Sequence, residues 1–265
     1  MLPNLTRRHL AAIALWLTLA IPAMPLAQEG GPVIAAASDL KFAITEIAAA
    51  FKTETGMKVQ LTTGSTGKFA RQIREGAPFQ IFMAADESYI LDLARDGFAP
   101  NQGDLYALGR IVVMVPHGSP IKADDGLDDL AAGLADGRVT RFAIANPDHA
   151  PYGRRAMEAL QHRGIWQTVQ PALILGENVS QAAQFATSGD AQGGIIAYSL
   201  ALSPAVSALG RYALIPEDWH APLRQRMVLL NDAGPEAKAF YAYMQGETAR
   251  KIMEAHGFTL PKDAR

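Results

Sequence analysis

The chain alternates short apolar runs with segments in which apolar residues recur every three or four positions. The first run, residues 33–37, reads Val-Ile-Ala-Ala-Ala, and apolar residues then follow at Leu40, Ile44, Ile47 and Phe51. The run predicts a short buried strand, and the 4, 3, 4 spacing predicts one face of an amphipathic helix. A strand followed directly by a helix is the unit from which parallel sheets are built.

The same unit recurs through the first hundred residues. We expect further strands at residues 57–61 and 79–84, and further helices from the 62–67 loop to Glu75 and from Asp86 to Ala94. Three such units in succession predict a parallel sheet wound with helices. Ligands of these sheets bind outside the carboxyl ends of the strands, so Ser38 and the 62–67 loop should share one edge.

A long apolar strand at residues 110–115 is a candidate for a crossover into a second lobe. The pattern then repeats, with expected strands at 142–145, 173–175 and 193–198 and helices at 154–162 and from Val179. A strand at 227–230 returns to the first lobe, and helices at 235–244 and 248–256 complete it. We therefore predict an α/β protein with lobe 1 at residues 28–112 and 227–265 and lobe 2 at 113–226, joined by hinges near 113–115 and 226–228.

The N-terminus reads as a signal peptide covering residues 1–27. Arg7 and Arg8 precede an apolar run at 10–21, and small residues follow up to Ala27. Twelve apolar residues are too few to span a membrane. The pattern favours export to the periplasm by the Sec route over the twin-arginine route, and the alternative is an uncleaved interfacial anchor.

Composition narrows the function classes. The net charge of −2 gives no electrostatic reason to expect nucleic acid or an anionic membrane surface as a partner. The absence of cysteine excludes disulfides, thiolate metal sites, cysteine nucleophiles and a lipid anchor on cysteine. A hydrophobic content of 49% is ample for two cores.

The loop at residues 62–68, Thr-Thr-Gly-Ser-Thr-Gly-Lys, leads straight into a helical pattern. Hydroxyls and free amides at a helix N-terminus favour an anion, although an ordinary Ser/Thr N-cap has the same appearance. The loop is not a Walker A motif, because Thr62 replaces the first glycine and Phe69 follows the lysine. Similar turns at Ser38, 146–153 and 177–181 suggest one site built from several helix N-termini.

Other catalytic and metal-binding patterns are weak. None of the six histidines lies three or four residues from another, which argues against a zinc site. Asp86 and Glu87 are adjacent, so they read as a helix cap rather than as a catalytic carboxylate pair. No Gly-x-Ser-x-Gly elbow occurs. A periplasmic enzyme using the 62–68 loop remains an alternative.

Several short segments, in order along residues 32–260, resemble the periplasmic molybdate-binding proteins of ABC importers. They are Ala36-Ala37-Ser38, Gly64-Ser65-Thr66-Gly67, Ala70-Arg71-Gln72-Ile73, Gly76-Ala77-Pro78, Ala84-Ala85-Asp86-Glu87, Asn146-Pro147, Ala150-Pro151-Tyr152-Gly153, Glu177-Asn178-Val179, Gly194-Ile195 with Tyr198, and the last segment from Ala239 to Phe258. Each is weak alone, and the ordered set carries the resemblance.

The resemblance implies a two-lobed class II periplasmic-binding-protein fold, each lobe a mixed, mainly parallel sheet flanked by helices. It implies a monomer that is not an enzyme, needs no cofactor, and passes molybdate or tungstate to a membrane-embedded ABC permease. Molybdenum would be present only as bound molybdate. The implied contacts are hydroxyls of Ser38, Thr66 (or Ser65, if the loop register slips by one) and Tyr198, with the backbone N–H of Val179 and, in part, that of Tyr152.

Asp39 departs from the pattern, because many relatives have an uncharged residue there. A carboxylate beside a dianion is unfavourable unless it faces away or pairs with Lys41. It would instead suit a partly protonated anion such as phosphate. Sulfate, as another tetrahedral oxyanion, and a small organic acid are further alternatives. Ser38 as a plain N-cap, Tyr152 as a turn aromatic, Tyr198 as a core tyrosine and a sensory role for the protein also remain open.

Overall fold

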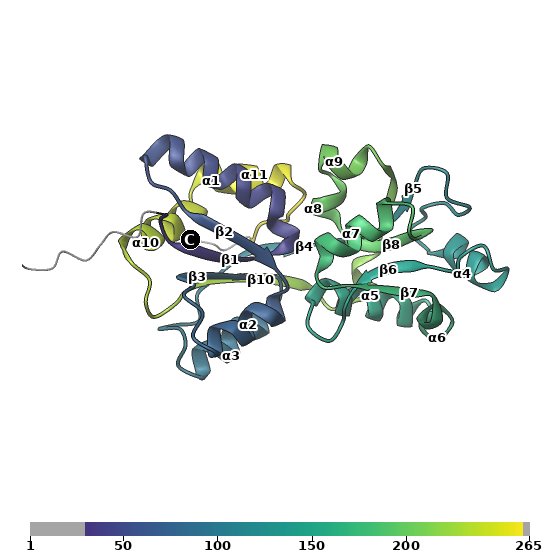
Figure 1. Ribbon diagram of the computed structural model, residues 1–265, viewed down its shortest axis with the longest axis horizontal. Helices are drawn as coiled ribbons and strands as arrows, with labels where there is room; N and C mark the ends of the chain where they lie inside the picture. The colour runs from purple at the N-terminus through teal and green to yellow at the C-terminus, as the bar shows by residue number, and fades with distance from the viewer. Residues whose placement is uncertain (1–29, 262–265) are drawn as a thin grey trace, which may run out of the picture.

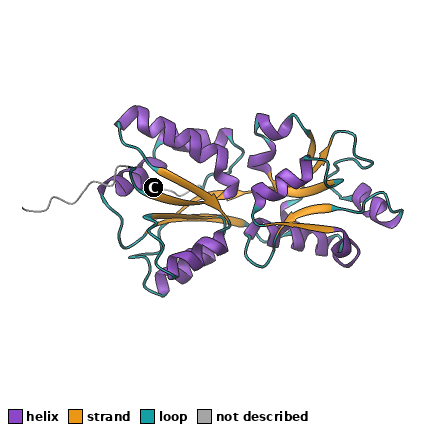
Figure 2. Ribbon diagram, viewed as in Figure 1, coloured by secondary structure: helices purple, strands orange, loops and turns teal. Residues whose placement is uncertain are grey.

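The computed structural model describes residues 30–261, which form two lobes side by side with both ends of the described chain in lobe 1 (Figure 1). The expected signal peptide lies outside the described residues. Each lobe holds one five-stranded mixed sheet flanked by helices, which confirms the predicted fold class (Figure 2).

The sheet of lobe 1 has the order β2-β1-β3-β10-β4. Its first three strands are parallel, and β10 runs antiparallel to both of its neighbours. The strands are β1 (Val33–Ala37), β2 (Gln60–Gly64), β3 (Ile81–Ala84), β4 (Asp104–Gly109) and β10 (Leu223–Leu229). The carboxyl ends of β1, β2 and β3 therefore meet at one edge, as the sequence predicts.

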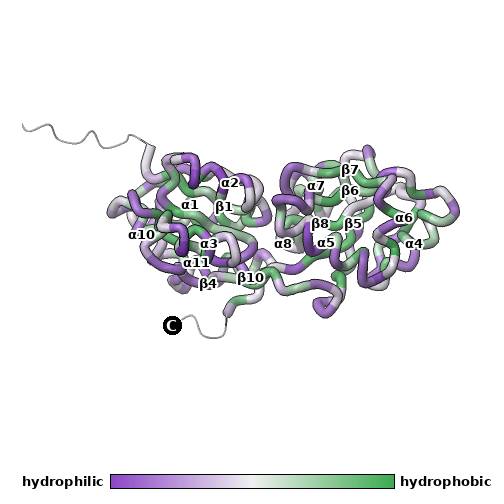
Figure 3. The backbone as a smooth tube through the Cα atoms, turned by 90° about the horizontal axis from the view of Figure 1, so that it is seen from below, coloured by the Kyte–Doolittle hydropathy of each residue, from purple (hydrophilic) through white to green (hydrophobic). Residues whose placement is uncertain are grey.

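Two layers of helices cover this sheet (Figure 1). They are α1 (Lys41–Thr55), α10 (Pro235–Met244) and α11 (Glu247–Ala255) on one face, and α2 (Thr66–Arg74) and α3 (Glu87–Arg95) on the other. Alternate residues of β1 enter the two cores: Ile34 packs with Phe51 of α1, whereas Ala35 packs with Phe69 of α2. The hydropathy-coloured tube shows apolar strands inside polar helical surfaces (Figure 3).

The sheet of lobe 2 has the order β7-β6-β8-β5-β9. Its strands are β5 (Ile111–Pro116), β6 (Phe142–Ala145), β7 (Leu173–Gly176), β8 (Gly193–Ala197) and β9 (Gly210–Leu214). Its helices are α4 (Asp128–Ala135), α5 (Pro151–His162), α6 (Trp166–Val169), α7 (Val179–Thr187), α8 (Tyr198–Ala201) and α9 (Pro204–Ser207). Three short 3-10 turns complete the described chain: η1 (Ser38–Leu40), η2 (Gln170–Ala172) and η3 (Glu217–Trp219).

The chain changes sheet twice. A single residue, Arg110, separates β4 from β5, and residues 215–222 separate β9 from β10. The sequence places the lobe boundaries at 112/113 and 226/227, which fall inside β5 and β10. An apolar run shows that a strand is buried, but it does not show which sheet the strand joins. The sequence therefore locates the two crossovers only to within a few residues.

Some elements differ from the sequence prediction. β2 occupies 60–64 rather than 57–61, and β4 and β9 lie in segments for which the sequence predicts no strand. The Asp86 cap is confirmed, because its carboxylate accepts the N–H of Ser88 at 3.0 Å. Within residues 30–261 no helix is long and apolar enough to cross a membrane, and no cluster of His, Asp and Glu suited to a metal ion occurs.

Candidate functional site

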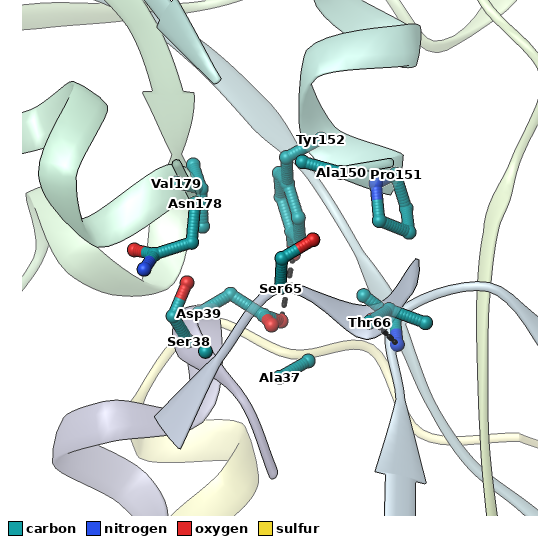
Figure 4. A pocket seen from close by; sticks show the side chains of 12 residues that line it. Ala37, Ser38, Asp39, Ser65, Thr66, Ala150, Pro151, Tyr152, Asn178 and Val179 are labelled. Atoms are coloured by element: carbon teal, nitrogen blue, oxygen red, sulfur yellow. Dashed lines mark hydrogen bonds between the residues drawn. The ribbon is translucent and has the colours of Figure 1, made fainter. Parts of the chain in front are cut away.

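A small pocket lies between the lobes, at the carboxyl ends of β1 and β2 and the N-termini of α2, α5 and α7 (Figure 4). Its cavity volume is about 10 Å³, which is about the room that a single water molecule needs. The lining comprises Ala37, Ser38, Asp39, Gly64, Ser65, Thr66, Ala85, Ala150, Pro151, Tyr152, Asn178 and Val179. Four segments that the sequence singles out as strand-to-helix turns therefore meet here.

Lobe 1 contributes side-chain hydroxyls. Thr66 is the first residue of α2, and its oxygen accepts the N–H of Ala85 at 3.1 Å. Ser38 begins η1, and its hydroxyl oxygen accepts the N–H of Ser180 at 3.4 Å. A hydroxyl that accepts from the protein keeps its own proton for another acceptor. Both residues are buried and line the pocket, so these protons are available to a guest there.

The hydroxyl of Ser65 makes hydrogen-bond contacts with His149 of lobe 2. This hydroxyl lies 2.8 Å from Nδ1 of His149 and 2.7 Å from the carbonyl oxygen of the same residue. Although Ser65 occupies the N-cap position of α2, it makes no side-chain cap. The hydroxyl of Thr66, rather than that of Ser65, is thus available to a guest, although both residues line the pocket.

The contact between Gly67 and His149 brings the two lobes close together. The N–H of Gly67 donates to the carbonyl of His149 at 2.9 Å. A Cβ on Gly67 would lie 2.6 Å from that same carbonyl oxygen, closer than such atoms approach in proteins. The glycine therefore permits the two lobes to meet beside the pocket.

Lobe 2 contributes helix N-termini. Val179 is the first residue of α7, and Tyr152 is the second residue of α5. The first N–H groups of a helix lack intrahelical acceptors, and the helix dipole is positive there. Asn178 caps α7 by accepting the N–H of Gln181 at 3.1 Å, which leaves the amide of Val179 free for the pocket.

The phenol of Tyr152 belongs to a buried network. It donates to Oδ2 of Asp39 at 3.0 Å and accepts from Nε2 of Gln225 at 3.0 Å. Gln225 also donates to Oδ2 of Asp39 at 2.6 Å and accepts from the hydroxyl of Tyr106 at 2.8 Å. Gly109 leaves space for this network, because a Cβ there would lie 2.3 Å from the Tyr152 oxygen.

Asp39 is a buried carboxyl in the wall of the pocket. Burial raises its pKa from 3.8 to about 6, against the lowering effect of the hydrogen bonds from Gln225 and Tyr152. Its Oδ1 atom has no hydrogen-bond partner within residues 30–261. The pairing with Lys41 considered from the sequence does not form: Lys41 is exposed, with Nζ 5.7 Å from the ring centroid of Phe42.

Cationic side chains lie outside the pocket. Its lining contains no Lys, Arg or His, and Lys68 pairs across the lobes with Glu177 while remaining partly exposed. Arg155 of α5 is nearly buried and reaches Asp86 of lobe 1 at 3.4 Å. These pairs join the lobes around the pocket and add no positive charge to its wall.

Tyr198 is not among the residues lining the pocket, so its expected contact with the guest stays a prediction. It begins α8, and its ring centroid lies 5.8 Å from that of Tyr212. On its other side it packs closely against Gly257, so its ring fills a contact with lobe 1.

Sequence reasoning missed two residues that shape the site. Gln225 lies at a register shift of β10, between Gln225 and Arg226, and such a bulge re-aims side chains. His149 lies in the 146–153 turn that the sequence marks, but its pairing with Ser65 joins residues 84 positions apart. Gln225 stands between Arg224 and Arg226 and before the predicted strand at 227–230, so the sequence carries no signal that points to it.

Comparisons with known proteins agree with this architecture. Residues 32–259 match the family described as bacterial extracellular solute-binding protein. The chain is 34% identical over 260 residues to the molybdate-binding protein ModA of Rhodobacter capsulatus, covering 97% of each chain. It is 33% identical over 248 residues to that of Escherichia coli K12, covering 92% of this chain and 95% of the relative.

Solved structures show the same fold. The periplasmic molybdate-binding protein of Azotobacter vinelandii superposes with a TM-score of 0.78 at 28% identity, covering 87% of this chain and 100% of that one. The sulfate-binding protein SubI of Mycobacterium tuberculosis gives 0.72 at 15% identity, over 89% and 88% of the two chains, a likeness of fold alone. The chain belongs to the bacterial extracellular solute-binding proteins, in the family of the molybdate-binding proteins ModA.

Proposed function

We propose that this protein captures molybdate or tungstate between its two lobes and delivers it to a membrane-embedded ABC permease. The observation that carries the proposal is the pocket itself: its free donors are uncharged and come from both lobes, and no cation lines it. The relatives named as molybdate-binding proteins match this chain along nearly its whole length.

The donors suit a tetrahedral dianion that carries only acceptor oxygens. Ser38 and Thr66 offer hydroxyl protons, and the first turns of α5 and α7 offer the amides of Tyr152 and Val179. Such donors are fixed by the fold before the guest arrives, so little reorganisation opposes binding. Helix dipoles add a favourable field without a full positive charge.

Delivery follows from the family. Extracellular solute-binding proteins work outside the cytoplasmic membrane, which agrees with the signal peptide expected at residues 1–27. We place the mature protein in the periplasm as a monomer. Release requires the lobes to part, and the two crossovers, at Arg110 and at 215–222, are the segments where a hinge can act.

A second candidate guest is hydrogen phosphate. The unpartnered Oδ1 atom of Asp39 favours it, because an ionised carboxylate can accept the proton that this anion carries. Molybdate and sulfate carry no such proton near neutral pH. The two candidates therefore predict opposite orders of affinity.

A ligand panel tests the proposal. Isothermal titration and thermal unfolding of the mature protein should be measured with molybdate, tungstate, sulfate and phosphate at pH 7. We expect molybdate and tungstate to bind and to raise the unfolding temperature, since a ligand at 100 times its Kd adds about 2.7 kcal/mol to stability. Binding of phosphate or sulfate with no heat from molybdate would overturn the proposed substrate.

A further inference from the structure

The carboxyl of Asp39 has two unlike oxygens. Oδ2 accepts hydrogen bonds from Gln225 and Tyr152, at 2.6 and 3.0 Å, and is saturated by them. Oδ1 is buried without a partner within residues 30–261, on a side chain that is 1% exposed and lines the pocket (Figure 4). An unpaired buried oxygen of this kind is costly unless a partner is supplied.

The two protonation states of Asp39 have opposite consequences for an anion in the pocket. In an ionised carboxyl, the negatively charged Oδ1 would face an oxygen of the bound anion. Both atoms are acceptors, so they repel each other in a site with little water. A neutral carboxyl keeps Oδ2 as the carbonyl that accepts from Gln225 and Tyr152. Its proton then lies on Oδ1, where it is a donor for the guest.

We propose that Asp39 holds the guest as a neutral acid, donating from Oδ1, so that capture of a dianion takes up one proton from solution. The inference rests on the proposed function, because it requires a dianionic guest in this pocket. It makes Asp39 a specificity-determining residue: guests that carry only acceptor oxygens are favoured, and guests that must donate a proton of their own are not.

The surroundings of Asp39 support proton uptake. Burial already raises its pKa to about 6, and a dianion beside it raises the pKa further. The titratable groups within its hydrogen-bond network are Tyr106 of β4 and Tyr152 of α5, whose pKa values burial holds well above 10. Neither therefore changes charge near neutral pH.

Cations on the elements packed around Asp39 are engaged elsewhere or exposed. Lys41 of α1 is exposed, Arg155 of α5 pairs with Asp86 and Glu158, and both Arg224 and Arg226 of β10 pair with Glu87. α7 and α8 carry no charged side chain. The other group near the pocket that titrates close to neutrality is His149, and burial lowers its pKa below 6.5.

These values define the pH window. Above pH 7, His149 stays neutral, while free Asp39 loses its proton with a pKa of about 6. If the bound form must be neutral, each pH unit above 7 weakens binding about tenfold, and the apparent Kd rises about thirtyfold from pH 7 to pH 8.5. The loss continues until pH reaches the pKa of Asp39 in the complex.

The decisive experiment is titration calorimetry of the whole mature protein with molybdate at pH 8, in two buffers of different ionisation enthalpy. We expect uptake of about one proton per molybdate bound in the wild type. Asp39→Asn presents an uncharged donor group, NH2, beside a carbonyl acceptor, much as the neutral acid presents O–H beside C=O, and should bind with no proton uptake and with a Kd that is flat from pH 7 to pH 8.5. Asp148→Asn, which removes an exposed carboxylate of the 146–153 turn, should keep the proton uptake of the wild type.

Each outcome decides a different question. Molybdate binding without proton uptake in the wild type overturns this inference and leaves the proposed function standing. Tighter binding of hydrogen phosphate than of molybdate, with no proton taken up, also overturns it and shows Asp39 to be an ionised acceptor. An absence of molybdate binding at any pH from 6 to 8.5 overturns the proposed function itself.

Discussion

The two lobes contribute different kinds of group to the same pocket. Lobe 1 supplies side chains: the hydroxyls of Ser38 and Thr66 and the carboxyl of Asp39. Lobe 2 supplies main-chain amides at the N-termini of α5 and α7, from Tyr152 and Val179, among side chains that are largely apolar.

This difference has consequences for specificity and for mutation. The amides of lobe 2 are fixed by helix geometry and survive nearly any substitution, so they provide a constant positive field for anions in general. The side chains of lobe 1 can be altered one at a time. Discrimination among oxyanions should therefore reside mainly in lobe 1, and general anion capture mainly in lobe 2.

The largest effect is expected when the carboxyl of Asp39 in lobe 1 is replaced, and it concerns the free energy of unfolding. The folded-state pKa of Asp39, about 6, lies above its ordinary value of 3.8, so folding favours the neutral acid. That contribution is fully present below about pH 4 and is lost as pH rises through 6, which costs the wild type about 3 kcal/mol. Asp39→Asn should therefore exceed the wild type in unfolding free energy by up to about 3 kcal/mol at pH 8.

Denaturant unfolding at pH 4 and pH 8 measures this effect without ligand. The advantage of Asp39→Asn should shrink to about 0.5 kcal/mol near pH 4, where the folded carboxyl is neutral and the unfolded one is about half protonated. A difference of the same size at both pH values would mean that the charge of Asp39 is not what destabilises the folded protein.

The next largest effect removes a donor of lobe 2. Val179→Pro deletes the N–H group at the first position of α7, where proline is tolerated because that amide has no intrahelical partner. We expect molybdate binding to weaken by about 2–3 kcal/mol, roughly 30-fold to 150-fold. Val179→Ala keeps the amide and is the matched control. Equal losses of affinity in the two variants would show that the N–H group of Val179 does not donate to the guest.

The third largest effect is expected when a single hydroxyl of lobe 1 is removed. Ser38→Ala and Thr66→Ala should each weaken molybdate binding by about 1–2 kcal/mol, because each leaves an acceptor of a desolvated anion without a donor. Thr62→Ala, on the exposed side of β2, is the control and should leave the Kd unchanged. Titration calorimetry checks all three, and losses below a few tenths of a kcal/mol in both site variants would disprove the role given to these hydroxyls.

The smallest effect is expected for Tyr198. Its ring packs against Tyr212 outside the pocket lining, so Tyr198→Phe removes no donor from the guest. The Kd for molybdate should shift by no more than about 0.3 kcal/mol, the size expected of a substitution away from the site. A tenfold loss by the same titration would return Tyr198 to the binding site.

The hydrophobic pattern of a segment predicts a helix or strand when that segment alone carries the signal. The run Phe142 to Ala145 and the helix from Pro235 to Met244 match β6 and α10 residue for residue, because each is a short apolar run or a periodic segment between clear breakers. β4 has no such signature, since it holds its place through pairing with β10, more than a hundred residues away. Pairing between strands so distant in the sequence cannot be recognised from the residues of one strand alone.

The candidate site divides in the same way. The turns at Ser38, Thr66, Tyr152 and Val179 follow from strand-to-helix patterns and the family resemblance, and the structure brings these residues to one pocket. The partners of Asp39 could not be predicted, because Gln225 reaches it across 186 residues of sequence. Buried polar networks are set by the packed fold, and their members are individually ordinary residues in the sequence.

The most direct test of the account is the position of the guest. Crystals of the mature protein grown with molybdate should be measured at wavelengths above and below the molybdenum absorption edge, so that the anomalous difference locates the metal atom. The account predicts one strong peak between the lobes, within hydrogen-bonding reach, through its oxygens, of Ser38, Thr66 and the amide of Val179. A peak elsewhere, or contacts to one lobe alone, would contradict it.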